Sequence, residues 1–115
     1  MGQSYQVYFN IKSENKFRSI HESNEASDLS EVILLLNDIQ SNEDCVSIYL
    51  NTEKLRVQIW GQKDNSKCIL ELHDARKGVC FSREFDKSAL KKRIELDMKE
   101  YVKNPRKYGF EAVSF

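Results

Sequence analysis

Hydrophobic and polar residues alternate along much of this chain, and the alternation predicts a series of strands. Every second residue from Tyr5 to Ile11 is apolar or aromatic, which is the period of a half-buried strand. The same alternation returns in four short segments joined by polar turns, at residues 46–50, 55–59, 68–73 and 79–85. Consecutive strands joined by short turns pair antiparallel, so these four segments predict a meander.

Two other segments repeat their apolar residues at the three- and four-residue spacing of a helix. The first helix is predicted over Leu29–Gln40, with Asp28 as its N-cap. The second is predicted to begin after Asp86, which is again a suitable N-cap. It should end by Asn104, because Pro105 disfavours helical geometry at the residue that precedes it.

The remaining segments complete the predicted order of elements. Residues 12–27 are mainly polar and predict a loop, with a short strand around Lys16–Ile20 as an alternative. The aromatic segment Tyr108–Phe115 predicts a closing strand. The order is then β-α-β-β-β-β-α-β, an α+β fold in which two helices pack on one face of a mostly antiparallel sheet. Because no repeat or linker interrupts it, we expect a single domain over residues 1–115.

The charge of the chain is balanced overall but unevenly placed. Its 115 residues include 18 Lys+Arg and 18 Asp+Glu, and this balance argues against a domain that binds nucleic acid through bulk positive charge. Basic residues concentrate between Lys87 and Lys107, whereas acids dominate several turns and strand ends between Glu43 and Asp86. No window resembles a membrane span or a secretory signal, and the three cysteines are widely spaced. We therefore expect a cytoplasmic protein with reduced thiols and no membrane association.

The residue types that bind metals or perform catalysis form no recognisable motif. Cys68, His73 and Cys80 converge if the strands that carry them pair. However, the chain has no C-x-x-C or H-x-x-x-H spacing and no fourth ligand at a familiar distance. We expect no metal or other cofactor, and we expect Cys68 and Cys80 to pack as small hydrophobic side chains. Glycine-rich phosphate loops and nucleophile motifs are absent as well, so we expect no enzyme.

What remains is a surface suited to a protein partner. If the apolar residues of segment 55–59 point into the core, Arg56 and Trp60 point outward, and these two residue types are enriched at binding hot spots. Acidic residues gather in the adjoining turns and strand ends. The alternative is that Trp60 closes one end of the core and that the acids only keep the turns soluble. The candidate partner-binding residues are Arg56, Trp60, Asp64, Glu71, His73, Asp74 and Glu84.

The succession of segments also carries a family resemblance. The segments are a strand at Tyr5–Ile11, a Leu-rich helix at Glu31–Ile39, the strands Leu55–Gly61 and Leu70–Asp74, a helix ending in Glu100–Pro105 and a closing strand at Phe110–Phe115. This order resembles the immunity proteins of bacterial polymorphic-toxin and contact-dependent growth-inhibition systems. The resemblance implies a cytosolic, non-catalytic inhibitor that binds the toxic C-terminal domain, often a nuclease, of a cognate effector. It assigns no individual residues, because these interfaces differ with each cognate pair.

Two other functions remain open from the sequence. The basic region 87–107, with Tyr101 and Tyr108 near its end, is compatible with a small nucleic-acid-binding module or hydrolase. An adaptor subunit of a larger complex fits the same pattern. The acidic turns favour a basic protein partner such as a nuclease, which holds phosphates with Lys and Arg. Toxin neutralisation without direct nucleic-acid contact is therefore the function that we expect.

Overall fold

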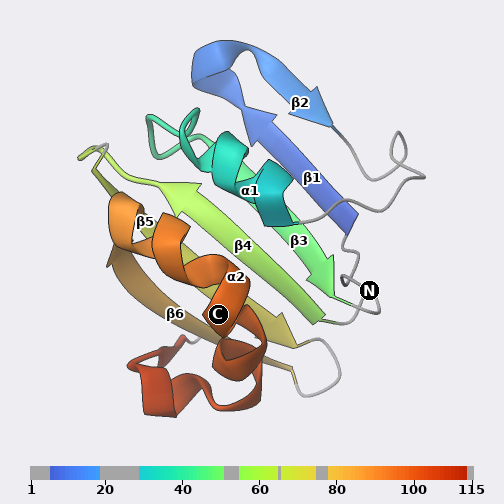
Figure 1. The fold of residues 1–115 in the computed structure, drawn as a ribbon, viewed down its shortest axis with the longest axis vertical. Coiled ribbons are helices and arrows are strands. Elements are labelled where there is room, and N and C mark those ends of the chain that lie inside the picture. Colours follow the sequence, from blue (N-terminus) through green and yellow to red (C-terminus); the bar gives the residue numbers. More distant parts are fainter. Residues whose placement is uncertain (1–5, 19–28, 51–54, 65, 75–77, 114–115) are drawn as a thin grey trace.

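The fold is a single antiparallel sheet with two α-helices on one face (Figure 1). The computed structural model describes residues 6–18, 29–50, 55–64, 66–74 and 78–113. The strands are β1 (Gln6–Ile11), β2 (Lys16–Arg18), β3 (Cys45–Leu50), β4 (Leu55–Gly61), β5 (Lys67–Asp74), β6 (Val79–Asp86) and β7 (Glu111–Val113). The helices are α1 (Leu29–Leu36), α2 (Lys87–Lys103) and the short 3-10 helices η1 (Lys12–Glu14) and η2 (Pro105–Tyr108). Among these residues the strand order is β2-β1-β3-β4-β5-β6-β7.

The α+β class and the β3–β6 meander are confirmed, while the order of elements differs in detail from the prediction. The short strand that was an alternative to a loop forms as β2, and η1 joins it to β1. β1 also pairs with β3, so the first strand lies inside the sheet rather than at its edge. The predicted N-cap Asp28 lies outside the described residues.

The prediction that the first helix continues to Gln40 is wrong, because α1 ends at Leu36. The two residues after it make tight i→i+3 hydrogen bonds, from Asn37 N to Leu34 O and from Asp38 N to Leu35 O. The backbone N–H of Gln40 then donates to the carboxylate of Asp44 instead of to a helical carbonyl. The end of α1 therefore depends on a side chain outside the helix. The spacing of apolar residues within the helix carries no information about that side chain.

The predicted closing strand begins later than expected. Residues 105–108 form η2, Gly109 adopts a positive φ of 85°, and Glu111–Val113 pair with β6, while Ser114 and Phe115 lie outside the described residues. Two aromatic rings of this segment, those of Tyr108 and Phe110, pack against the core instead of lining one face of a strand. Tyr108 packs edge-on against Tyr101 of α2, and Phe110 lies 5.9 Å from Phe85 between ring centroids.

Helix α2 begins and ends where the sequence predicts. Asp86 occupies the N-cap position, but its carboxylate makes no capping bond and accepts a hydrogen bond from Lys67 Nζ at 3.1 Å. The last helical residue is Lys103, directly before Asn104 and Pro105. The buried side chains that α2 turns toward the sheet include Leu90, Ile94 and Tyr101.

The hydrophobic core lies between the helices and the inner face of the sheet. The alternation of the central strands is strict, and the register places Val57 opposite Leu72 and Ile59 opposite Leu70. Among the described residues, the fully buried core side chains are Val7, Ile11, Val32, Leu36, Ile39, Val46, Ile48, Val57, Ile59, Cys68, Leu70, Leu90 and Ile94. The opposite side chains of the same strands therefore form a second face that neither helix covers.

Gly61 marks a close approach between the end of β4 and the turn after α1. A Cβ at this position would lie 2.1 Å from Ser41 O and 2.7 Å from Ile39 Cγ2. Gly61→Ala is therefore expected to lower the free energy of unfolding by about 2 kcal/mol, because the turn must shift to admit a methyl group. Urea denaturation measures the change. Gly78→Ala is the informative comparison, since a Cβ there meets nothing within 4 Å although its φ is +64°. A larger loss at Gly78 than at Gly61 would contradict this account.

Candidate functional site

The face of the sheet opposite the helices carries the candidate site. Antiparallel pairing aligns every second residue of neighbouring strands into rows across this face. One row reads Tyr49, Arg56, His73 and Cys80; the next reads Ser47, Gln58, Glu71 and Ser82; the third reads Cys45, Trp60, Ile69 and Glu84. We call these twelve residues the open face.

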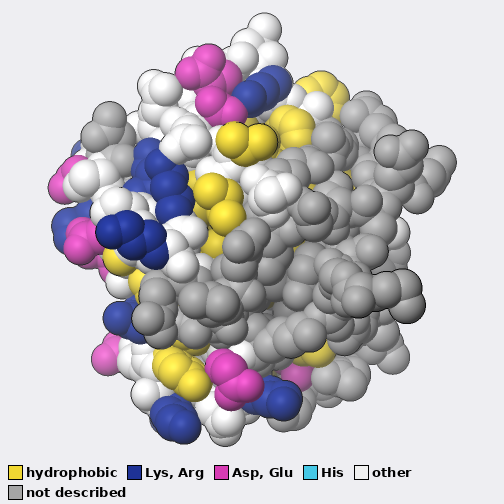
Figure 2. Space-filling view, in the orientation of Figure 1, with side chains coloured by type: hydrophobic (Ala, Val, Ile, Leu, Met, Phe, Trp, Pro, Cys, Tyr) yellow, Lys and Arg dark blue, Asp and Glu magenta, His cyan; other side chains and the backbone are white. Residues whose placement is uncertain are grey.

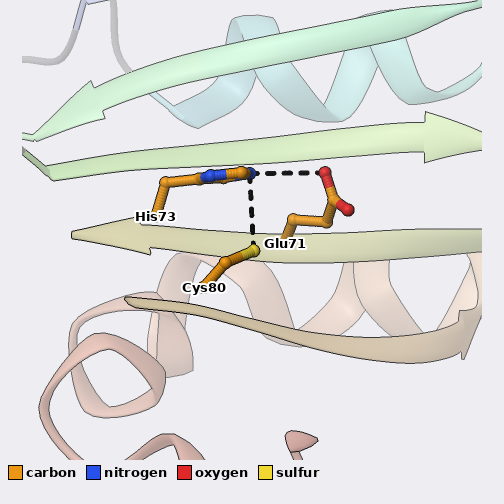
Figure 3. Close-up of side chains that lie close together, drawn as sticks. All are labelled: Glu71, His73 and Cys80. Carbon is orange, nitrogen blue, oxygen red and sulfur yellow. Dashed lines mark hydrogen bonds and ion pairs between the residues drawn. The ribbon is translucent and has the colours of Figure 1, made fainter. Parts of the chain in front are cut away.

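A chain of polar contacts runs through the middle of the open face. Trp60 Nε1 donates a hydrogen bond to Glu71 Oε1 at 3.0 Å. The same oxygen lies 3.3 Å from His73 Nε2, and that nitrogen lies 3.7 Å from Cys80 Sγ on the neighbouring strand. Figure 3 shows the imidazole, the carboxylate and the thiol pointing toward one another along the sheet. Four residues from three strands are thus held in one network.

Burial changes the chemistry of the thiol in this network. Burial raises the pKa of Cys80 to about 11, and the nearby Glu71 carboxylate acts in the same direction, while the Arg56 guanidinium opposes them. Cys45 behaves alike, with burial as the main cause of a pKa of about 11. At neutral pH both thiols are protonated, so neither is an activated nucleophile.

Arg56 carries an unsatisfied hydrogen-bond donor on the open face. Its side chain is half-buried, and its buried Nε has no hydrogen-bond partner among the described residues. A buried donor without an acceptor costs about 1–3 kcal/mol, and most native structures avoid that cost. Such a group is retained more readily at a functional surface than at a purely structural one.

Aromatic side chains line the β1–β3 side of the same face. Tyr8 and Tyr49 stack edge to face with their ring centroids 5.3 Å apart. Phe17 of β2 is 63% exposed, which is unusual for a ring of that size. A hollow of about 610 Å³ lies here, and Tyr8, Phe17 and Trp60 contribute to its lining. The aromatic hollow and the polar network share Trp60.

Most of the predicted partner-binding residues meet on one surface. The structure places Arg56, Trp60, Glu71, His73 and Glu84 on the open face, as the alternation predicts. Two predicted residues lie elsewhere.

Asp64 lies in the turn between β4 and β5, where its carboxylate accepts hydrogen bonds from the backbone N–H and hydroxyl of Ser66. Those two bonds lower the pKa of Asp64. Asp74 ends β5 on the helix side of the sheet, next to a pocket of about 390 Å³ that Lys103 and Arg106 also line.

Sequence reasoning predicted part of this neighbourhood and missed the rest. Cys80 and Cys68 are both buried, as expected of small hydrophobic side chains. Of the three residues that were expected to converge if their strands pair, Cys80 does lie beside His73, whereas Cys68 lies on the helix side of the sheet opposite Phe85. Tyr8 and Phe17 were not singled out, although Tyr8 interrupts an otherwise polar alternate row of the first strand. The presence of Tyr8 in this row was the one indication in the sequence of an aromatic patch on the outer face.

The fold separates charge between its two layers. The segment Lys87–Tyr108, which forms α2 and η2, contains eight Lys and Arg residues against three Asp and Glu. Figure 2 views this side, where Lys and Arg side chains lie near the first turns of α2 with acidic side chains close to them. The opposite side of the sheet is more acidic: register places Glu71, Glu84, Asp86 and Glu111 there, with Arg56 and Lys67 as cations among the described residues.

Comparison with known proteins identifies no relative of this chain. A scan against protein-family models and searches of curated proteins and of solved structures find no match for this chain. Within the described segments, neither helix has the length and apolar character needed to cross a bilayer.

Proposed function

We propose that this protein is a non-catalytic, cytoplasmic immunity protein, which binds and neutralises the toxic C-terminal domain of a cognate bacterial effector. The observation that carries the proposal is the open face, where Trp60 sits between an aromatic hollow and a fixed polar network. Buried Trp and Arg anchors surrounded by polar side chains are the usual composition of a protein-binding hot spot. The order of elements, which resembles toxin-immunity proteins, supports the same function.

The charge distribution supports a basic partner. A nuclease domain binds phosphates with Lys and Arg, so its active-site surface is positive. The acidic groups Glu84, Asp86 and Asp64 lie along one side of the open face and its adjoining turn. Opposite charges on two docking surfaces raise the association rate and orient the encounter. Docking of the open face over the active site would then exclude the nucleic-acid substrate.

The alternative of nucleic-acid binding through α2 has weaker support. Lys87 Nζ donates to Ile39 O and Lys91 Nζ donates to Asn37 Oδ1, so both ammonium groups tie α2 to the turn after α1. Burial lowers the pKa of Lys87, with the neighbouring Lys91 acting in the same direction. Arg83 Nη1, next to η2, donates a hydrogen bond to Tyr108 O at 2.6 Å. Several basic side chains near this region are therefore engaged within the fold.

Co-expression tests the proposal. The open reading frame immediately upstream of this gene should encode a toxic C-terminal domain, and the two proteins should co-purify when expressed together. Expression of the toxic domain alone should arrest growth, and this protein should restore it. If no such reading frame exists, or if the pair does not associate, the proposal loses its basis. Retention of RNA or DNA at low salt by the isolated protein would instead favour the nucleic-acid alternative.

Charge reversal on the acidic side of the open face should slow complex formation. Asp64 and Glu84 are exposed, and replacing both with Lys is expected to lower the association rate about tenfold at low salt. Stopped-flow measurements over a range of ionic strengths check this, and the variant should show a shallower salt dependence. Glu100→Lys is the matched control, because Glu100 is an exposed acid of α2 on the opposite layer. An equal effect of the control would disprove steering by the open face.

A further inference from the structure

The network at the centre of the open face also has the composition of a metal site. Glu71, His73 and Cys80 offer a carboxylate oxygen, an imidazole nitrogen and a sulfur, and these three atoms lie within 4.8 Å of one another. His73 Nε2 is 3.3 Å from the carboxylate oxygen and 3.7 Å from the sulfur, so the imidazole nitrogen faces both other donor atoms (Figure 3). We propose that Glu71, His73 and Cys80 bind a zinc ion, with water as the fourth ligand.

The two separations that involve the imidazole nitrogen fit a tetrahedral ion closely. Zinc lies about 2.0–2.2 Å from nitrogen and oxygen ligands and about 2.3 Å from sulfur. At tetrahedral angles these lengths separate nitrogen from oxygen by about 3.4 Å and nitrogen from sulfur by about 3.6 Å. The observed separations of 3.3 Å and 3.7 Å match these two values, while the carboxylate oxygen and the sulfur lie within 4.8 Å of each other.

The choice of ion follows from the donor set. One thiolate, one imidazole and one carboxylate form the mixed sulfur, nitrogen and oxygen set that suits zinc, whereas Mg²⁺ and Ca²⁺ take oxygen ligands. Three protein ligands leave a fourth position for water. When zinc binds, the Cys80 thiol transfers its proton to solvent and the sulfur bonds to the metal as a thiolate.

The surroundings of the three residues are built to hold them in place. Glu71 and His73 lie two residues apart on β5, and Cys80 is the cross-strand partner of His73 on β6. Trp60 Nε1 donates to the Glu71 carboxylate, as outer hydrogen-bond donors do for carboxylate ligands in metal sites. The Glu71 and His73 side chains are 22% and 21% exposed, so an ion can reach them from solvent while the thiol stays protected.

Titration of the isolated full-length protein tests the site without any partner, so its outcome is independent of the proposed function. One equivalent of Zn²⁺ should bind with release of a proton and should change the fluorescence of Trp60, the only tryptophan in the chain. Co²⁺ should give the visible absorption of a tetrahedral ion together with a sulfur-to-cobalt charge-transfer band. Excess Mg²⁺ should not displace either metal.

Three variants and one control assign the ligands. Cys80→Ser should abolish the charge-transfer band, and His73→Gln and Glu71→Gln should each weaken zinc binding at least about tenfold. Glu71→Gln keeps an acceptor for Trp60, so a loss of affinity there reports the missing carboxylate.

Cys45→Ser is the matched control, because Cys45 is another buried cysteine of the open face. It should bind zinc as the unmodified protein does, and thermal unfolding should show that every variant is folded. Absence of a charge-transfer band in the unmodified protein, or its persistence in Cys80→Ser, would overturn the proposal.

Discussion

Replacement of Asp44 by Ala is expected to lower the free energy of unfolding by about 4 kcal/mol. Asp44 is completely buried, and its carboxylate accepts hydrogen bonds from the backbone N–H groups of Ser13, Gln40 and Ser41 and from the Ser13 hydroxyl. Hydrogen bonds to a charged group contribute about 1.5–3 kcal/mol each, and their donors are left without acceptors in the variant. Asp44→Asn keeps one acceptor oxygen and should lose about half as much. Urea denaturation at neutral pH measures both.

The effect of Asp44 should also depend on pH. Burial alone would raise the pKa of Asp44, but its hydrogen bonds from Ser13, Gln40 and Ser41 together outweigh burial and lower it. A lowered pKa in the folded state means that the carboxylate stabilises the fold above its unfolded-state pKa of about 4. That contribution is lost as the pH falls through the folded-state pKa. The stability difference between the protein and Asp44→Ala should therefore shrink below about pH 4.

Asp38→Ala is the control for this prediction. Asp38 lies in the same turn and pairs with Lys16 at 2.5 Å, but both side chains are substantially exposed. Exposed ion pairs contribute at most about 1 kcal/mol, so this variant should unfold almost as the parent protein does. A loss at Asp38 as large as the loss at Asp44 would contradict the assignment of Asp44 as the anchor of this turn.

Replacement of Trp60 by Ala is expected to weaken binding to the toxic domain by about 3 kcal/mol, which is on the order of 100-fold in Kd. Trp60 joins the aromatic hollow to the polar network, and its truncation also leaves the Glu71 carboxylate without its indole donor. Isothermal titration calorimetry with a catalytically inactive toxic domain gives the affinity. Loss of growth protection in cells provides a second measurement.

Two controls separate this effect from a general loss of hydrophobic surface. Leu34 of α1 is 67% exposed on the helix side, and Leu34→Ala should leave the affinity unchanged. Phe17→Ala removes an exposed ring from the edge of the hollow and should have an intermediate effect. If Leu34→Ala weakens binding as much as Trp60→Ala does, the partner docks on the helices and the proposed surface is wrong.

Much of the sheet follows directly from the sequence. The strict alternation around residues 55–59 and 68–73 predicted which side chains face the helices, and Val57 and Leu70 lie there as expected. The same alternation predicted that Trp60 points away from the helices, and it does so. Such patterns succeed because a strand that buries one face must repeat its apolar residues with period two.

The parts that the sequence did not predict depend on contacts between distant residues. The end of α1 depends on Asp44, a residue outside the helix, and no helical periodicity contains that information. The third neighbour of His73 also depends on the pairing: Cys80 lies opposite it, as expected if the two strands pair, but Glu71 completes the group, whereas Cys68 lies on the helix side. Cross-strand clusters of this kind escape the sequence spacings by which metal sites are usually recognised.

The two outermost strands of the sheet cover only part of their neighbours. Among the described residues, β2 pairs with residues 9–11 of β1, and β7 pairs with residues 80–82 of β6. In recognition by strand addition the main-chain hydrogen bonds give affinity, whereas side chains give specificity. A partner would then discriminate this protein through side chains of the open face, which can be exchanged without altering backbone pairing. Closely related copies of the gene could diverge in specificity by substitution at a few outward positions while retaining one scaffold.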